Sequence, residues 1–390
     1  MFATGIGMSQ IAPVLPLYIT ELGVTDPGMI NQLSGLAYGI TFITSAIFSP
    51  IWGGAADKYG RKPMLLRASL GMGVVVFLTG FAPSVAVLIG LRLLLGTIAG
   101  YSTACNTLIA TQTEKENAGF ALGTLATASV AGALLGPLIG GFIGDTFGMR
   151  PIFYITGTFM FIAFTATLLF VKENFVPVEK KNVKSVREVW GEIPEKNLTI
   201  TLAVTFFIIS LGLYSIEPII TIYVTQLTPD LSHVALIAGM AFSLSGLGNI
   251  IAAPALGKVS DRSGAHIVLL LCLIMAGAFY IPQAFVQNAW QLMAFRFMLG
   301  LTLGGLTPAV MTLLRKITPG SHVGRIFGVT MSAQYLGVFA GSVLGGQISA
   351  AFGIPCVLIV TSAIMFVNAA WVYFKVYRRF HNKKTEGTST

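Results

Sequence analysis

Long segments without charged residues alternate with short charged segments along the whole chain. The uncharged runs include 1–20, 27–56, 68–91, 93–113, 117–144, 151–171, 197–216, 231–257, 263–295 and 326–374. A helix needs about 20 mostly apolar residues to cross a hydrocarbon core of about 30 Å. The run 326–374 is more than twice that length, so we expect a turn within it at Phe352–Pro355. The pattern predicts an all-α membrane protein with twelve transmembrane helices, at 1–20, 32–54, 64–82, 84–106, 118–144, 151–171, 198–226, 233–256, 265–286, 290–314, 324–348 and 353–375.

The composition excludes several other classes of protein. Only 10% of the residues are charged and 54% are hydrophobic, whereas about a quarter of the residues in a soluble domain are charged. A soluble enzyme, a nucleic-acid-binding module and a disulfide-stapled domain are therefore excluded. Cys105, Cys272 and Cys356 lie far apart in apolar stretches and are expected to be free thiols. The four histidines lack the spacing of metal ligands, so neither a metal nor another cofactor is expected.

The formal charge of +9 is explained by membrane topology. If both termini are cytoplasmic, all but three of the 24 Lys and Arg residues fall in inner loops and at inner helix ends. The exceptions are Arg150 in an outer loop and Arg92 and Arg296 inside spans. This asymmetry follows the positive-inside rule and predicts a multi-pass membrane protein with both termini in the cytoplasm, in contact with anionic lipids. A short segment missing before Met1 stays open, while a cleaved signal peptide is disfavoured because no charged region precedes the first apolar run.

Two halves of the sequence are related by a direct repeat. An offset of 204 residues places Asp57 on Asp261 and Arg92 on Arg296, and an offset of 205 places Gly136 on Gly341. Because each half has six spans, both cross the membrane with the same orientation, as in transporters whose halves rock about a central site. The predicted domains are a six-helix bundle at 1–171, a linker at 172–197, a six-helix bundle at 198–377 and a cytoplasmic tail at 378–390. The charged linker has helical periodicity at 183–193, which fits either an amphipathic surface helix or a solvated tether.

Three motifs within this repeat resemble those of the major facilitator superfamily, and the resemblance covers essentially the whole chain. Gly53–Pro63 is similar to the family's loop between spans 2 and 3, and Leu88–Gly96, which contains Arg92, is similar to its span 4 motif. The segment Gly132–Gly141 resembles the span 5 motif of drug:proton antiporters. The pattern is closest to the twelve-span bacterial multidrug efflux pumps. The resemblance implies a proton-coupled antiporter of the bacterial cytoplasmic membrane that exports amphipathic, often cationic or zwitterionic drugs by alternating access and confers antibiotic resistance. Nothing in the sequence requires oligomerisation, so a monomer is expected.

The first motif has two interpretations. In the family this loop latches one conformational state against span 11, which the resemblance implies for Gly53, Asp57, Gly60, Arg61 and Lys62. Glu114 or Glu116 are then candidate partners for Arg61. From the residues alone, Gly53, Gly54 and Gly60 are expected to permit unusual backbone geometry. The alternative is simply a positively charged inner loop with a tight turn.

A stripe of glycines marks the fifth predicted span. Gly132, Gly136, Gly140, Gly144 and Gly148 recur every four residues, and such a stripe lets another helix backbone approach closely. Pro137 is expected to bend this helix. The antiporter motif implied by the resemblance consists of Gly132, Gly136, Pro137, Gly140 and Gly141, although ordinary small-residue packing would give the same pattern. Asp145 at the outer end is expected to be merely solvated.

Three charged residues lie well inside predicted spans: Glu217, Arg92 and Arg296. Charged groups at such positions cost about 2.5–3.5 kcal/mol on insertion scales, so they are functional candidates. A low-dielectric surrounding disfavours the charged form of a carboxyl group, so Glu217 can alternate between a neutral and a charged state. Pro218, directly after it, is expected to loosen the helix and leave a backbone carbonyl free. We assign proton coupling to Glu217, with Arg92 acting on it electrostatically. The alternatives are that Glu217 is paired with Arg92 or a carbonyl for packing, and that Arg296 is structural.

A substrate pocket is expected near the membrane midplane. Gln10, Tyr214, Gln334 and Tyr335 offer aromatic faces and polar groups suited to flat cationic molecules. The main alternative function is an exporter of a sugar or another metabolite on the same scaffold. An intramembrane enzyme is disfavoured because no catalytic cluster accompanies Glu217, and a sensor is disfavoured because no loop could house an output domain.

Overall fold

A computed structural model describes residues 1–173, 175, 195–229, 231–318 and 323–380. All twelve predicted spans are present within these residues: eleven helices are long and apolar enough to cross a membrane, and a bent pair forms the twelfth span. The repeat-linking segment with helical periodicity, 183–193, and the tail beyond residue 380 lie outside the described residues. The expected turn is confirmed, because one helix ends at Phe352 and the next begins at Ile354.

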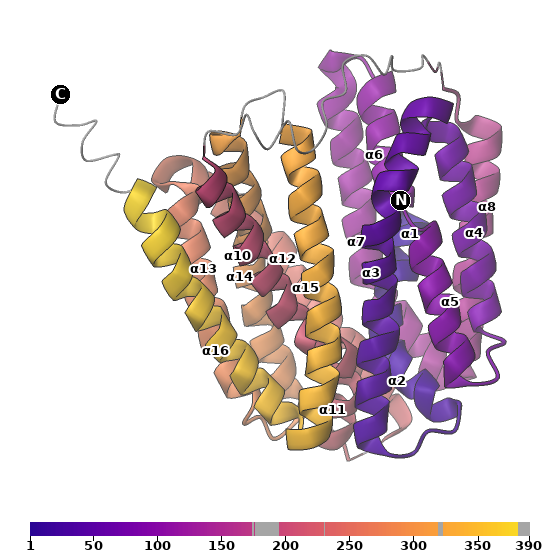
Figure 1. Ribbon diagram of the computed structural model, residues 1–390. Helices are drawn as coiled ribbons and strands as arrows, with labels where there is room; N and C mark the ends of the chain where they lie inside the picture. Colours follow the sequence, from indigo (N-terminus) through magenta and orange to yellow (C-terminus); the bar gives the residue numbers. More distant parts are fainter. Residues whose placement is uncertain (174, 176–194, 230, 319–322, 381–390) are drawn as a thin grey trace. The chain divides into compact units, whose positions relative to one another are not determined.

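Three of the twelve spans are interrupted (Figure 1). The first consists of α1 (Phe2–Ser9) and α2 (Ile11–Glu21), bent by 45°. The fourth consists of α5 (Val85–Ile98) and α6 (Tyr101–Gln112), and the seventh consists of α10 (Lys196–Ile216), the 3₁₀ turn η2 (Glu217–Ile219) and α11 (Ile220–Leu227). The other spans are α3 (Pro27–Tyr59), α4 (Arg61–Thr79), α7 (Lys115–Phe147), α8 (Arg150–Phe170), α12 (Val234–Ser263), α13 (Ala265–Gln283), α14 (Ala289–Ile317), α15 (Val323–Phe352) and α16 (Ile354–Val372, followed by the π-helical turn Tyr373–Tyr377).

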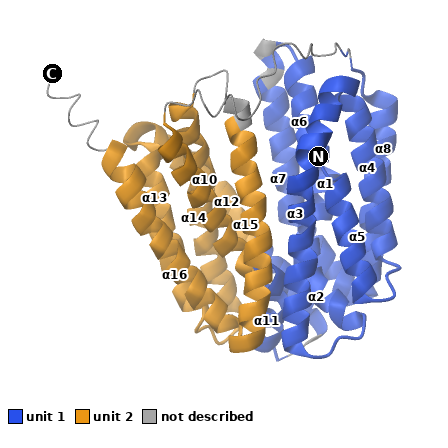
Figure 2. Cartoon of the chain, in the orientation of Figure 1, with its two compact units in different colours: residues 1–181, 217–243 blue, residues 182–216, 244–390 orange. Residues whose placement is uncertain are grey.

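The helices form two compact units, coloured separately in Figure 2. Unit 1 comprises residues 1–181 and 217–243, and unit 2 comprises residues 182–216 and 244–390. In unit 1, α1 packs on α7, α3 on α5, and α4 on α8. In unit 2, α10 packs on α15, and α13 packs on α14 and α16. The segment 217–243 is thus counted with unit 1, although both its flanks belong to unit 2.

The sequence repeat reappears as equivalent helix contacts inside each unit. A Cβ on Gly132 would collide with the carbonyl oxygen of Phe2, and one on Gly337 would collide with that of Phe207. These four residues are related in pairs by the offset of 205. Because lipid is as apolar as the helices, close backbone approach of this kind, rather than the hydrophobic effect, is what holds membrane helices together.

Helix ends are repeated as well. Ser84 caps α5 by accepting from the amide of Val87, and Asn288 caps α14 by accepting from the amide of Gln291 at 2.9 Å. Left-handed glycines at equivalent positions end α3 and α12 (Gly60 and Gly264) and α7 and α15 (Gly148 and Gly353). Short polar side chains that cap and glycines that reverse the chain therefore fix the same turns in both halves.

Candidate functional site

The seventh span is broken at its intramembrane acid. α10 ends at Ile216, and Glu217 opens a 3₁₀ turn that leads into α11. Pro218 cannot donate to the carbonyl of Tyr214, which lies four residues earlier, and its ring disfavours the preceding helical turn. The sequence expectation that Pro218 loosens the helix at Glu217 is confirmed. Glu217 is half-buried and is the first residue of the stretch counted with unit 1.

The first span is broken at the corresponding place. Pro13 is the repeat partner of Pro218, and the bend between α1 and α2 falls at Gln10. In unit 1 the segments after the two breaks pack on each other, since the Thr221 hydroxyl donates to the carbonyl of Pro13 at 2.8 Å. Proline-interrupted helices at corresponding positions of two repeats are the feature that marks binding sites in transporters built this way.

Arg92 is buried in α5 with only 4% of its surface exposed. Its guanidinium carbon lies 6.0 Å from the ring centroid of Phe153, and its backbone carbonyl accepts from Thr41 at 3.2 Å. Among the described residues, its Nε and Nη2 have no hydrogen-bond partner. These two nitrogens therefore do not support the alternative in which Glu217 merely forms an ion pair with Arg92. At these two nitrogens no described acid neutralises the charge, so its field is available to a nearby titrating group or ligand.

The glycine-rich helix α7 uses two faces inside unit 1. One face approaches α1: a Cβ on Gly136 would lie 2.7 Å from the carbonyl oxygen of Ile6, and one on Gly140 would lie 2.8 Å from Cβ of Gln10. The other face approaches the start of α12: a Cβ on Gly141 would collide with the carbonyl of Ala235. The helix continues through Pro137 without a break.

Asp145, at the end of α7, is not merely solvated as the sequence suggested. Its Oδ1 accepts from the amide of Ala235 at 3.0 Å and its Oδ2 accepts from the amide of Leu236 at 2.8 Å. These amides belong to the first turn of α12, which has few acceptors of its own. Nothing in the local sequence around Asp145 indicates this partner, which lies far along the chain.

The loop between α3 and α4 is organised by two acids. Asp57 pairs with Arg61 at 2.5 Å, so Asp57 rather than Glu114 is the acid next to the arginine. Glu114 is exposed, and the side chain of Glu116 lies outside the described residues. Glu173, which the sequence did not single out, accepts from the amides of Arg61 and Lys62 at 2.7 Å each and so caps α4.

Only one glycine of this loop has unusual backbone geometry. Gly60 has a φ of +96° and links the two helices, while Gly53 and Gly54 lie inside the regular helix α3. The expectation of unusual geometry was therefore wrong for Gly53 and Gly54. A Cβ on Gly60 would also lie 2.9 Å from a carboxylate oxygen of Glu173, so the cap needs a glycine here.

The residues expected to bind substrate are divided between the units. Gln10 lies in unit 1 with 2% exposure and donates through Nε2 to the hydroxyl of Thr156, so its amide already has a partner. Tyr214 on α10 and Gln334 and Tyr335 on α15 lie in unit 2 and are half-buried. Each therefore has surface that a ligand could contact within its own unit.

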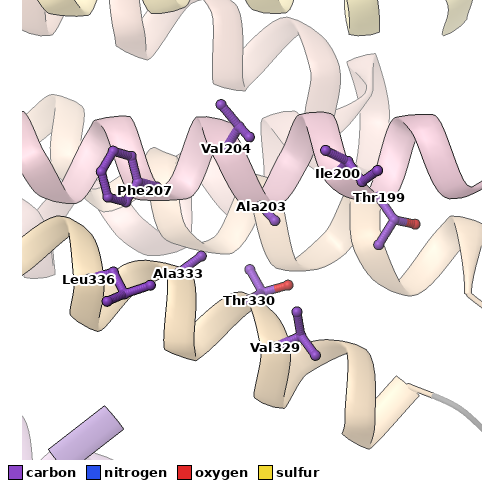
Figure 3. A pocket seen from close by; sticks show the side chains of 9 residues that line it. All are labelled: Thr199, Ile200, Ala203, Val204, Phe207, Val329, Thr330, Ala333 and Leu336. Atoms are coloured by element: carbon purple, nitrogen blue, oxygen red, sulfur yellow. The ribbon is translucent and has the colours of Figure 1, made fainter. Parts of the chain in front are cut away.

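Unit 2 has an apolar groove between α10 and α15 (Figure 3), which Tyr214, Gln334 and Tyr335 of the same two helices do not line. Its volume is about 300 Å³, at the lower end of the range for small-molecule sites. The sequence analysis did not predict this groove, although the α10 residues that line it recur at helical spacing on one face. The groove is lined by Thr199, Ile200, Ala203, Val204, Phe207, Val329, Thr330, Ala333 and Leu336.

No cluster of three or more metal-binding side chains occurs within the described ranges. The three cysteines are free, as expected, and Cys272 is buried in α13.

A twelve-span repeat of this kind, with broken helices at equivalent positions and charges inside the spans, defines a membrane transporter. A family model described as the Major Facilitator Superfamily matches residues 1–238 and, again, residues 202–389. The chain belongs to the Major Facilitator Superfamily and is a transporter, not an enzyme.

Curated relatives match over nearly the full length. The multidrug resistance protein MdtG of Salmonella typhimurium is 44% identical over 378 residues, which cover 97% of this chain and 94% of that protein. The proteins of the same name from Salmonella dublin and Salmonella newport match to the same extent.

Solved structures show the same fold at low identity. A bacterial homolog of the human lysosomal transporter Spinster, crystallised inward-facing and unoccupied, superposes with a TM-score of 0.79 at 15% identity, covering 96% of this chain and 94% of that one. The human organic anion transporter MFSD10 (TETRAN) superposes with a TM-score of 0.70 at 14% identity, covering 95% of this chain and 96% of that one.

Proposed function

We propose that this protein is a proton-coupled multidrug efflux antiporter that exports amphipathic, often cationic or zwitterionic drugs by alternating access. The observation that carries the proposal is the break of the seventh span at Glu217, matched by a break of the first span at Gln10. An acid at a broken helix inside the membrane has backbone freedom and a low-dielectric surrounding, which a proton carrier needs. The names of the MdtG relatives support drugs as the substrate class.

In the proposed cycle, drug binds from the cytoplasm or the inner leaflet while Glu217 is ionised. A proton from outside then neutralises Glu217, the attraction for a cationic drug is lost, and the drug leaves on the outer side. Arg92, which cannot release its proton, biases this exchange through its charge. Drug and proton therefore compete for one carboxylate, and the proton gradient drives export without a nucleotide.

Substrate contacts are proposed from both sequence and structure. The groove of α10 and α15 accepts the apolar part of a drug, and Tyr214, Gln334 and Tyr335 on the same two helices supply aromatic and polar contacts in the proposal. Gln10 is the corresponding polar group at the break of the first span. In the proposal, the antiporter motif of Gly132, Gly136, Pro137, Gly140 and Gly141 seals the outer side, and the loop motif of Gly53, Asp57, Gly60, Arg61 and Lys62 acts as a conformational latch.

The protein is proposed to act as a monomer in the bacterial cytoplasmic membrane, with both termini in the cytoplasm. This orientation places the excess of Lys and Arg on the cytoplasmic side, where they also contact anionic lipid headgroups.

The test is proton-gradient-driven uptake of ethidium or norfloxacin into inverted membrane vesicles. Wild type should accumulate drug. Glu217→Gln, which mimics the protonated acid, should bind a cationic drug more weakly and should fall to the level of vesicles without the transporter. The matched control is Glu195→Gln, just before α10, where the acid pairs with Arg379 at 2.5 Å and should not affect coupling.

Two results would contradict the proposal in different ways. If wild type moves neither compound, multidrug export is wrong and a screen of metabolites follows. If Glu217→Gln accumulates drug as wild type does, the proton is carried by another group.

A further inference from the structure

The carboxylate of Asp145 caps a helix that belongs to another part of the sequence. Asp145 lies in the last turn of α7, and its two carboxylate oxygens accept from the amides of Ala235 and Leu236, the second and third residues of α12. In an ordinary helix these amides are satisfied by the side chain of the residue just before the helix. Here that role is taken by a residue of another helix, so the cap also ties α7 to α12.

The contact continues along both helices within unit 1. A Cβ on Gly239 would collide with the carbonyl oxygen of Pro137. One turn further on, the Ser243 hydroxyl donates to the carbonyl of Leu134 at 2.6 Å. The interface therefore has a polar contact at each end and close backbone packing between them. Pro137 belongs to the antiporter motif, so one face of that motif holds the start of α12.

The packing of glycines on helix backbones is shared by both halves, but the cap by a carboxylate is not. The offset of 205 places Ala350 at the position of Asp145. In the first half, α3 is capped by the residue directly before it, because Asp26 accepts from the amide of Met29 at 2.6 Å. The fold can thus complete such a helix start locally, and the Asp145 cap is an addition specific to one half.

The start of α12, which this contact holds, belongs to the second half of the sequence but packs as part of unit 1. Residues 217–243 are counted with unit 1, whereas the chain before and after them is counted with unit 2. In alternating access the two halves come together on one side of the membrane while they separate on the other. A segment of the second half held by unit 1 must be released in the opposite state.

We infer that Asp145 is a positioning residue of the transport cycle, which clamps the start of α12 to α7 in one access state and must release it in the other. The inference rests on the proposed alternating-access function. The clamp consists of Asp145 with Ala235 and Leu236, Pro137 with Gly239, and Leu134 with Ser243.

A reversible cross-link tests whether the clamp must open. A Cβ on Gly144 would lie 3.4 Å from Cβ of Ala235, close to the spacing in disulfides of about 3.5–4.5 Å. In a background in which Cys105, Cys272 and Cys356 are replaced by Ala, the pair Gly144→Cys/Ala235→Cys is oxidised in vesicles. We expect drug transport to be lost, drug binding to remain, and transport to return on reduction.

The matched control links helices whose contact belongs to the shared scaffold. A Cβ on Gly73 would lie 3.1 Å from Cβ of Met160, which joins α4 to α8. The oxidised pair Gly73→Cys/Met160→Cys should transport as well as its reduced form. If the oxidised Gly144→Cys/Ala235→Cys protein also transports at the reduced rate, the clamp need not open and the inference is overturned.

A second measurement does not depend on drug transport. With Ala235→Cys as the sole cysteine in nanodiscs, Asp145→Ala should raise the rate of maleimide labelling severalfold, and Asp145→Asn, which keeps one acceptor oxygen, should raise it less. Asp26→Ala, which removes a cap local to α3, should leave the rate unchanged.

An unchanged labelling rate in a folded Asp145→Ala protein would show that the carboxylate does not hold α12. If labelling responds as expected but wild type transports no drug, the proposed function fails while the clamp stands.

Discussion

The buried hydrogen bond between Gln10 and Thr156 has a chemically different counterpart in unit 2. The repeat places Ser215 and Thr361 at the same two positions, and their hydroxyls lie 2.7 Å apart. Ser215 also donates to the carbonyl of Gly212 at 2.7 Å, so Thr361 is the donor in that pair. In unit 1, by contrast, the amide of Gln10 donates and the hydroxyl of Thr156 accepts.

This difference predicts unequal costs for the same substitution. Thr156→Val leaves a buried amide donor of Gln10 without this acceptor and should lower the free energy of unfolding by about 1–3 kcal/mol. Thr361→Val removes only a donor to Ser215, whose own proton is still bonded, and should cost about 1 kcal/mol or less. Thermal unfolding in detergent measures both, and equal shifts for the two variants would contradict the assignment of donors.

Among the helices, α7 and α15 have the same task in their units: each presents glycines to a partner backbone. Gly136 of α7 meets α1, and Gly341 of α15 meets α10, where a Cβ would collide with the carbonyl of Leu211. Not every glycine of α7 does this, because a Cβ on Gly123 would meet nothing within 4 Å. The stripe is therefore a packing device only where another backbone is close.

Accordingly, Gly136→Ala and Gly341→Ala should each destabilise the protein by about 1–3 kcal/mol, since the added methyl group forces the helices apart. Gly123→Ala is the control and should be neutral or stabilising by up to about 1 kcal/mol, because alanine favours the helix. The melting temperatures of the three purified variants decide this. A loss for Gly123→Ala as large as for the other two would contradict the idea that close backbone contact sets the cost.

For the molecule as a whole, the distribution of charge should fix the orientation in the membrane. Lys and Arg residues gather at the loops and helix ends that the twelve spans place on one side, together with the C-terminal residues. The membrane potential and insertion machinery keep such positive segments in the cytoplasm.

A reporter at the C-terminus should therefore behave as a cytoplasmic one. A fused green fluorescent protein should fluoresce, and a fused alkaline phosphatase should be inactive. Alkaline phosphatase fused after Phe147, at the far end of α7, is the control and should be active. The reverse result at the C-terminus would invert the topology and move the Asp145 clamp to the cytoplasmic face.

The sequence by itself determined the class of protein, the twelve spans, the turn at Gly353 and the repeat. These features are linear: the length of an apolar run, a fixed offset between motifs and a glycine at a turn can all be read without knowing what lies nearby. Pro218 likewise predicted the break at Glu217, because a missing amide acts on its own helix. The position of the break within the fourth span was missed, since Ala99–Gly100 lies in an apolar run that looks continuous.

Only the tertiary structure decided which partner each polar or small residue has. A glycine stripe reads the same whatever helix approaches it, so the two faces of α7 could not be separated in the sequence. Asp145 was expected to be merely solvated and Glu173 was not singled out, yet each caps a helix distant in the chain. Such caps depend on where the first amides of another helix lie in space, and no local pattern encodes that position.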